Sequence, residues 1–290
     1  MTPELLFKHP IILVAFVALA LAEWAWRRRP GGEGYDVQAA TGSVGVMVLG
    51  FLAKPVSAFV IGGFYLAVSG HVGWSWPVDD WRSWAIGFLA VEFAYYWFHR
   101  FSHTVRWLWA THAVHHSAQQ FVLPAAIRLG WTGALSGGWL IYLPLVLLGM
   151  PPAMLVTLLG ANLLYQYLLH TELVKRLGPL ESVFNTPSHH RAHHSSDEEF
   201  LDCNFGGVLI VFDRLFGTFR REPTQGGLRY GLVHPLESHN PFTIALREWW
   251  LIWREVRAAR SWEERARILV ARPGSHPPDQ PELIDAKVTP

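Results

Sequence analysis

With 290 residues, of which 51% are hydrophobic and only 16% are charged, the chain carries far fewer charges than the roughly 25% of a soluble domain, so a membrane protein is expected. Its formal net charge of +1 gives no strong electrostatic footprint, so a nucleic-acid partner has no support in the composition. Cys203 is the single cysteine, which excludes internal disulfide bonds and a thiolate-rich zinc or iron–sulfur site.

Residues 1–82 are predicted to form N-terminal membrane anchor helices. The first apolar stretch, residues 11–26, is followed by three consecutive arginines at 27–29. A signal peptide carries its positive charge before the apolar run, so this stretch is expected to be a retained anchor. The second stretch, residues 41–68, is rich in glycine and interrupted by a lysine–proline pair at 54–55, which makes it a weaker candidate span.

Two further apolar stretches lie in the middle of the chain. Residues 84–98 contain Glu92 and end at the first histidine cluster. Residues 129–171 contain no Asp, Glu, Lys or Arg, and Pro151 and Pro152 divide them into two arms, each near the ~20 residues that a spanning helix needs. This pattern predicts a helical hairpin that dips through the bilayer.

Lysine and arginine in the short loops predict the orientation. If five candidate helices alternate across the membrane, one side receives most of these residues, and the positive-inside rule makes that side cytoplasmic. Every histidine cluster falls on the same side, together with the polar segment that follows residue 171. The expected fold is therefore an all-α, multi-pass integral membrane protein in which a cytoplasmic helical cap holds the histidine-rich site.

The C-terminal part has two different compositions. Residues 241–272 mix tryptophans with arginines, which predicts an interfacial amphipathic helix, although an ordinary surface helix packed on the cap would show the same pattern. Residues 273–290 are polar and rich in proline, so a disordered tail is expected.

Three histidine clusters carry the strongest chemical signal, with the sequences HRFSH at 99–103, HAVHH at 112–116 and HRAHH at 190–194. Histidines three or four residues apart share one face of a helix, so each cluster can direct two or three imidazoles at one point. Eight imidazoles exceed the four ligands of a closed zinc site, which favours two metals. The expected metal ligands are His99, His103, His112, His115, His116, His190, His193 and His194, with His170 at the end of the charge-free stretch as a ninth.

Ligand type alone leaves iron, zinc, copper and nickel open. A dinuclear, nitrogen-rich site beside lipid suits the activation of O2 for attack on an unactivated C–H bond, and this context favours redox-active iron. Reducing equivalents must come from a separate protein or a small reductant, because the chain has no dinucleotide-binding fingerprint.

Four further residues are expected in supporting roles, since metal-bound imidazoles usually donate their other N–H to a carboxylate or carbonyl. Glu92 lies two helical turns before His99, and a carboxylate within an apolar helix needs a partner. His189, Asp202 and Asn204 flank the third cluster. His189 is either a ligand or an orienting neighbour, and we expect the second role.

These residues resemble the fatty acid hydroxylase, or sterol desaturase, superfamily, whose pattern is H-x(3–4)-H followed by two H-x(2–3)-H-H elements. The segments YYWFHR at 95–100, YQYLLHTE at 165–172, NTPSHHRAHH at 185–194 and DRLFGTF at 213–219 are similar to its alkylglycerol monooxygenase branch in particular. The resemblance implies a catalytic domain at 83–240.

It also implies a membrane-bound, non-haem di-iron oxygenase that uses O2 to hydroxylate or desaturate a lipid, such as an alkylglycerol or a fatty-acyl chain. The external reductant is tetrahydropterin in the alkylglycerol branch, and an electron-transfer protein is the other possibility. A sterol or carotenoid oxidase of the same fold is an alternative. A metal transporter is a third class, but transporters place their ligands near the bilayer midplane on broken helices, whereas these clusters are expected at helix ends and in the cap.

Overall fold

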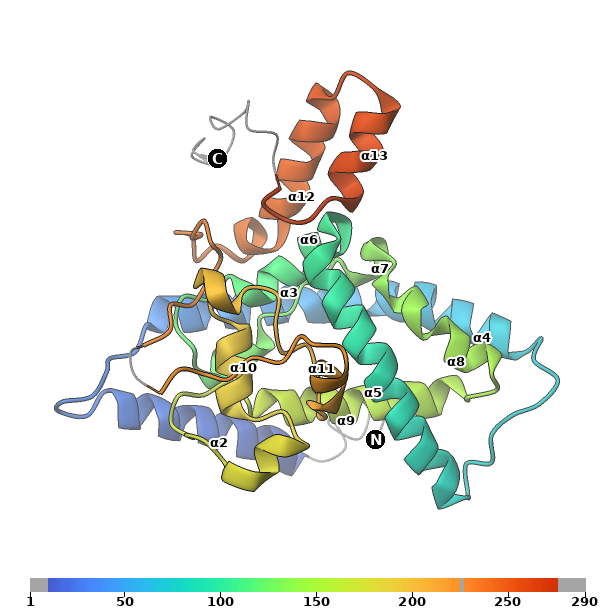
Figure 1. The fold of residues 1–290 in the computed structure, drawn as a ribbon, viewed down its shortest axis with the longest axis horizontal. Helices are drawn as coiled ribbons and strands as arrows, with labels where there is room; N and C mark the ends of the chain where they lie inside the picture. Colours follow the sequence, from blue (N-terminus) through green and yellow to red (C-terminus); the bar gives the residue numbers. More distant parts are fainter. Residues whose placement is uncertain (1–9, 225–226, 276–290) are drawn as a thin grey trace.

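The computed structural model describes residues 10–224 and 227–275 (Figure 1). Within these residues every regular element is a helix, and no strand forms. Two isolated β-bridges join loops of the polar segment, one between Phe184 and Leu209 and one between Ser195 and Tyr230. The all-α class predicted from the sequence is therefore confirmed.

The N-terminal part folds into apolar helices, which are α2 (Pro10–Arg27), α3 (Val37–Ser57), the π-helical turn η1 (Ala58–Gly62) and α4 (Gly63–Ser69). The last three form one continuous helix, although Pro55 within it lacks the backbone N–H that an α-helical hydrogen bond needs. The resulting helix, Val37–Ser69, has a mean hydropathy of 2.1 and is long and apolar enough to cross a membrane. It alone meets both criteria among the described residues, although its sequence made it the weaker candidate.

Large apolar side chains on these helices point away from the protein. Ile11 on α2 is 73% exposed, and Leu52 and Phe59 on the longer helix are 73% and 82% exposed. Contiguous exposed apolar surface of this kind is unfavourable in water and marks contact with a partner or with lipid. These faces therefore suit the membrane contact expected for residues 1–82.

The charge-free segment at 129–171 does not fold into the two long helices that were predicted for it. It contains α7 (Gly133–Ser136), the 3₁₀ helix η3 (Gly138–Tyr142), α8 (Leu143–Leu147) and α9 (Pro152–Tyr167). Gly137 has a φ of 71°, a left-handed conformation that ends α7 and breaks the first arm. The predicted pair of ~20-residue arms is thus replaced by short helices before the proline pair and one helix of 16 residues after it.

The helix α5 (Trp81–Thr104) packs against α9 and η3, and α4 packs against α8 and α9. The apolar core lies among these helices. Its buried members are Tyr65, Val91, Ala94, Tyr95, Tyr142, Val146, Met150, Met154 and Leu155. The chain turns at Val105, whose backbone is extended, and continues as α6 (Arg106–His116). The polar segment adds η4 (Gly178–Ser182), α10 (Pro187–His193), η5 (Glu198–Phe200) and α11 (Val211–Leu215), while η2 (Leu123–Ile127) follows α6.

Two C-terminal helices, α12 (Pro241–Ala258) and α13 (Trp262–Val270), form a pair that projects from one side of the molecule (Figure 1). One amphipathic helix was expected here, but the backbone becomes extended at Ala259, and Ser261 caps the second helix by accepting a hydrogen bond from the Glu264 N–H at 3.1 Å. Arg106 of α6 holds α12 through hydrogen bonds to Glu255. The predicted disordered tail lies, from residue 276 onward, outside the described residues.

Candidate metal centre

Nine histidines form two adjacent groups. The five-histidine group contains His99, His103, His112, His116 and His193, and the four-histidine group contains His115, His170, His190 and His194. Within each group one ring nitrogen of every histidine lies within 4.8 Å of all the others. The structure thus brings together the same nine side chains that the sequence singled out as ligands, and it divides them into two sets.

Helix geometry explains this division. His112 and His116 of α6 are four residues apart and share a face, so both enter the five-histidine group. His115 lies about 100° around the helix from His116 and enters the other group. In the third cluster the four-residue pair, His190 and His194, joins the four-histidine group and His193 turns to the other one. Each H-x-x-H-H element therefore serves both groups.

Backbone carbonyl groups orient three of the rings. The Nδ1 of His99 donates to the Phe205 carbonyl at 2.8 Å, and the Nδ1 of His193 donates to the Cys203 carbonyl at 2.7 Å. The Nδ1 of His170 donates in the same way to the Gln166 carbonyl, one turn earlier, at 2.8 Å. A carbonyl oxygen can only accept, so these Nδ1 atoms carry the proton and each neutral ring keeps a lone pair on Nε2.

Those lone pairs converge. The Nε2 atoms of His99 and His112 are 2.9 Å apart, and the Nε2 atoms of His170 and His190 are 3.1 Å apart. The buried Nε2 atoms of His103, His193 and His194 have no hydrogen-bond partner. Buried polar atoms are rarely left unsatisfied, and facing lone pairs repel unless a cation lies between them.

The donor set fits a metal. Burial lowers the pKa of His193 to about 4, so its ring is neutral near pH 7, which is the form that binds metals. All-imidazole ligation suits iron, copper, nickel or zinc, and two sets of four or more rings provide for two ions. The residues present therefore fit a dinuclear centre.

The loop that carries the Cys203 and Phe205 carbonyls is itself held by Glu92. This carboxylate, 1% exposed on α5, accepts hydrogen bonds from the backbone N–H groups of Val208 and Leu209 at 2.8 and 2.9 Å and from Asn162 at 2.5 Å. Direct contact between Glu92 and a metal-binding histidine was the expectation, but within the described part of the chain Glu92 forms no hydrogen bond to a histidine. Glu92 acts on the ligands through the loop.

Asp213 holds the same loop from α11 and was not singled out by sequence reasoning. Its carboxylate accepts hydrogen bonds from the N–H groups of Phe205 and Gly206 and from the Thr218 hydroxyl, each at 2.7 Å. Burial raises the pKa of Asp213 to about 6. The available signal was a carboxylate inside the apolar run VFDRLF, which requires polar partners just as Glu92 does.

The other expected supporting residues have different roles. An Asp202 oxygen lies 3.6 Å from the Nδ1 of His103, an ion-pair distance longer than a hydrogen bond. Asn204 joins two backbone segments by donating to the carbonyls of His189 and Arg220. The ring of His189 belongs to neither histidine group and packs edge-on against Phe219 with ring centroids 5.1 Å apart.

A cavity of about 870 Å³ lies beside Trp109 of α6. Trp109 forms part of its wall, and the Trp109 ring centroid lies 5.2 Å from that of His103 and 5.5 Å from that of His116. The opposite wall belongs to α12, α13 and the segment after them. The C-terminal helix pair therefore shapes a space whose wall includes a ring that packs beside two histidines of the five-histidine group.

Comparison with known proteins gives a consistent picture. Residues 84–218 match the fatty acid hydroxylase family model. The chain is 40% identical over 209 residues to the alkylglycerol monooxygenase of Danio rerio, covering 72% of this chain and 46% of that protein. The human alkylglycerol monooxygenase is 39% identical over 201 residues, covering 69% of this chain and 44% of that protein.

A bacterial protein is also similar. The ornithine lipid hydroxylase OlsE of Rhizobium tropici is 29% identical over 237 residues, which cover 77% of this chain and 68% of that protein. The chain spans less than half the length of the alkylglycerol monooxygenases it matches. No solved structure matches it.

Proposed function

We propose that the protein is a membrane-bound monooxygenase that uses O2 and two irons to hydroxylate, or desaturate, a lipid at a C–H bond, because residues 84–218 match the fatty acid hydroxylase family model. The convergence of nine histidines into two groups is the observation that carries the proposal. A structural membrane protein has no use for so many buried ring nitrogens without partners.

The proposed roles of the residues follow from their contacts. Iron held by the two groups would supply the O2 activation that no amino-acid side chain provides. The carbonyls of Cys203, Phe205 and Gln166 fix the rings, so that the ligand nitrogens are oriented before an ion binds. Eight of the nine grouped histidines are no more than 7% exposed. This low exposure excludes bulk water from the reacting centre.

The proposed substrate is a membrane lipid. The named relatives act on an alkylglycerol in one case and an ornithine lipid in the other, which are both amphiphiles with long hydrocarbon chains. The described exposed apolar faces of α2 and Val37–Ser69 suit a protein that meets such a molecule in the bilayer. An alkylglycerol or a fatty-acyl chain is the first choice, and a sterol or carotenoid is the alternative. A separate electron donor, tetrahydropterin or an electron-transfer protein, completes the reaction.

We also propose a multi-pass topology with the histidine groups on the cytoplasmic side, which rests on the positive-inside rule. The test is the accessibility of single cysteines introduced at exposed loop positions, such as Leu177 and Leu201, in a Cys203→Ser background. Labelling of both positions only from the cytoplasmic side is the expected result. Labelling from the opposite side would overturn the orientation.

The ligand assignment has a matched control within one motif. His190→Ala removes a ring of the four-histidine group, whereas His189→Ala removes the neighbouring ring that lies outside both groups. Protein purified in detergent is expected to contain about two irons per chain, about one after His190→Ala, and two after His189→Ala. A wild-type protein with one tightly bound metal would refute the dinuclear site.

Lipid analysis of cells tests the activity itself. Cells that produce the wild-type chain, with iron and a reductant present, are expected to accumulate an oxidised lipid that is absent from cells producing His190→Ala. The mass change distinguishes hydroxylation from desaturation. Identical lipid profiles would reject lipid oxidation even if both irons bind.

A further inference from the structure

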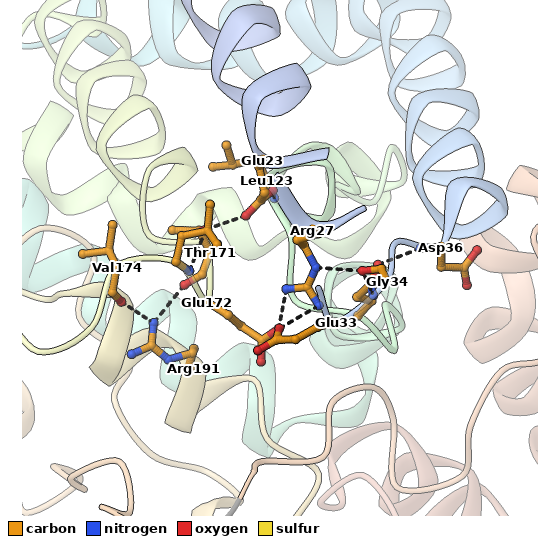
Figure 2. Close-up of polar contacts among 12 residues, drawn as sticks. Glu23, Arg27, Glu33, Gly34, Asp36, Leu123, Thr171, Glu172, Val174 and Arg191 are labelled. Carbon is orange, nitrogen blue, oxygen red and sulfur yellow. Dashed lines mark hydrogen bonds and ion pairs between the residues drawn. The ribbon is translucent and has the colours of Figure 1, made fainter. Parts of the chain in front are cut away.

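Helix α2 has an inverted distribution of polar and apolar side chains. Its apolar residues are exposed or half-buried, and its two buried residues in the described range are the charged ones, Glu23 and Arg27, which are 1% and 4% exposed. They lie four residues apart and so share one face, which is turned toward the protein (Figure 2). A helix that served only to anchor the chain would need no buried charges there.

Glu23 bonds two segments that meet at one histidine. One carboxylate oxygen accepts a hydrogen bond from the Leu123 N–H at 2.7 Å, and the other accepts one from the Thr171 hydroxyl (Figure 2). Thr171 directly follows His170. Leu123 lies two residues after Phe121, whose ring stacks on the His170 ring with centroids 5.4 Å apart and planes at 20°. Both contacts of Glu23 therefore act on the position of His170.

The segment after His170 is held from two sides. Arg27 forms an ion pair with Glu172 at 2.7 Å. From the opposite side, one guanidinium nitrogen of Arg191 donates to the carbonyls of Thr171 and Val174 at 2.8 and 2.7 Å (Figure 2). Because Arg191 follows His190, this clamp fixes the two segments whose histidines have Nε2 atoms 3.1 Å apart.

A further contact joins α2 to the end of α9. The Tyr167 hydroxyl donates to the Phe16 carbonyl at 3.0 Å, and the two rings stack with centroids 4.1 Å apart. Tyr167 lies three residues before His170. Helix α2 thus contacts the chain on both sides of this histidine.

We propose that α2 is a positioning element of the four-histidine group, with Glu23 and Arg27 as the positioning residues, although α2 lies outside the segment that matches the family model. This inference rests on the proposed function, since it assigns α2 to one of the two proposed metal sites. Loss of the Glu23 contacts is expected to free His170 and to leave the five-histidine group in place, because no member of that group adjoins Thr171 or Leu123 in the sequence.

The test is metal content and affinity in a set of single and double variants. Glu23→Ala is expected to weaken metal binding at the four-histidine group at least ~10-fold, the lower end of the effect of removing a residue that orients a ligand, and to reduce the purified protein from about two irons per chain to about one. His170→Ala is expected to give one iron by itself. Adding Glu23→Ala to His170→Ala is expected to change nothing further, whereas adding it to His99→Ala is expected to leave almost no iron.

Three controls separate positioning from general destabilisation. Iron retained by the five-histidine group shows that Glu23→Ala is folded. Glu23→Gln, which can accept from the Leu123 N–H and donate to the Thr171 hydroxyl, is expected to restore most of the second iron. Glu33 also forms an ion pair with Arg27, but its side chain is 68% exposed and, within the described residues, it forms no hydrogen bond or ion pair with the segment after His170. The Glu33→Gln variant is therefore expected to retain both irons.

The outcomes distinguish this inference from the proposed function. Two irons in Glu23→Ala, or an equal loss of iron when it is added to either histidine variant, would overturn the positioning role while the dinuclear site stands. Fewer than two irons in the wild-type protein would overturn both.

Discussion

Replacing Glu92 with alanine is the sharpest test of how the loop at 203–209 holds the five-histidine group. The change removes the acceptor of three buried hydrogen bonds, from Asn162, Val208 and Leu209. A hydrogen bond to a charged acceptor contributes about 1.5–3 kcal/mol, and such terms overlap when they share one acceptor. We therefore expect Glu92→Ala to lower the free energy of unfolding by about 3–5 kcal/mol, less than the sum of three separate bonds because the terms overlap.

The measurement is thermal unfolding of the detergent-purified protein. A chain of this size loses about 2 °C in Tm for each kcal/mol, so a decrease of roughly 6–10 °C is expected. Iron content is measured in parallel, because the freed loop no longer holds the carbonyls that orient His99 and His193. Leu89→Ala, at a 54% exposed position on the same helix, is the control and is expected to retain both irons.

Two results would refute the reasoning about Glu92. A variant with unchanged Tm would mean that its hydrogen bonds contribute nothing net. A variant with lowered Tm but both irons at wild-type affinity would mean that the loop carbonyls do not orient the ligands.

Three further predictions concern the same loop and the metals. Gly207→Ala is expected to lower Tm by about as much as Glu92→Ala does. A Cβ at this position would lie 2.0 Å from the Nδ2 of Asn162, the side chain that donates a hydrogen bond to Glu92. Gly227→Ala is the control, because the space around its Cβ position is open. The pKa of Asp213 is raised from 3.8 to about 6 in the folded protein, so the folded state favours the neutral acid more than the unfolded chain does. The free energy of unfolding therefore falls as the pH rises from about 4 to 6. The free energy of unfolding is measured for the wild type and for Asp213→Asn between pH 4 and 7. Over this interval the variant is expected to gain roughly 3 kcal/mol of stability relative to the wild type, at ~1.36 kcal/mol per pKa unit. A difference in stability that does not change with pH would contradict this. Removal of iron by a chelator is expected to lower the free energy of unfolding by about 4 kcal/mol for each site at which the free metal had exceeded Kd by 1,000-fold. An unchanged Tm would show that the histidine groups bind no stabilising ion.

The nine grouped histidines could be predicted from the sequence because their spacing is local. Residues four apart share a helix face whatever the tertiary structure is, so the pairs His99–His103 and His112–His116 needed only a helix to be brought together. The division into two groups was also implicit in the H-x-x-H-H spacing, since adjacent histidines on a helix diverge by about 100°.

The loop and the hairpin were harder to predict for a physical reason. The carbonyls of Cys203 and Phe205 carry no signal in the sequence, because every residue has a backbone carbonyl. The charge-free stretch at 129–171 looked like two spanning arms by composition, and composition does not record that Gly137 adopts a left-handed conformation or that short helices pack side chains across one another. In the same way, Pro55 marked an interruption in the sequence, but the helix continues through it.

Glu23 shows what a rule based on sequence neighbours can predict and what it cannot. A carboxylate inside an apolar helix needs a partner, and that rule was sufficient to single out Glu92. Applied to residues 11–26 it also predicts a protein-facing partner for Glu23, but the partners, Leu123 and Thr171, lie 100 and 148 residues later in the chain. Only the fold identifies them, and it places both beside His170. A buried charged residue in a helix whose apolar side chains are exposed is therefore best interpreted by asking which buried segment it orients, and for α2 that segment carries a proposed metal ligand.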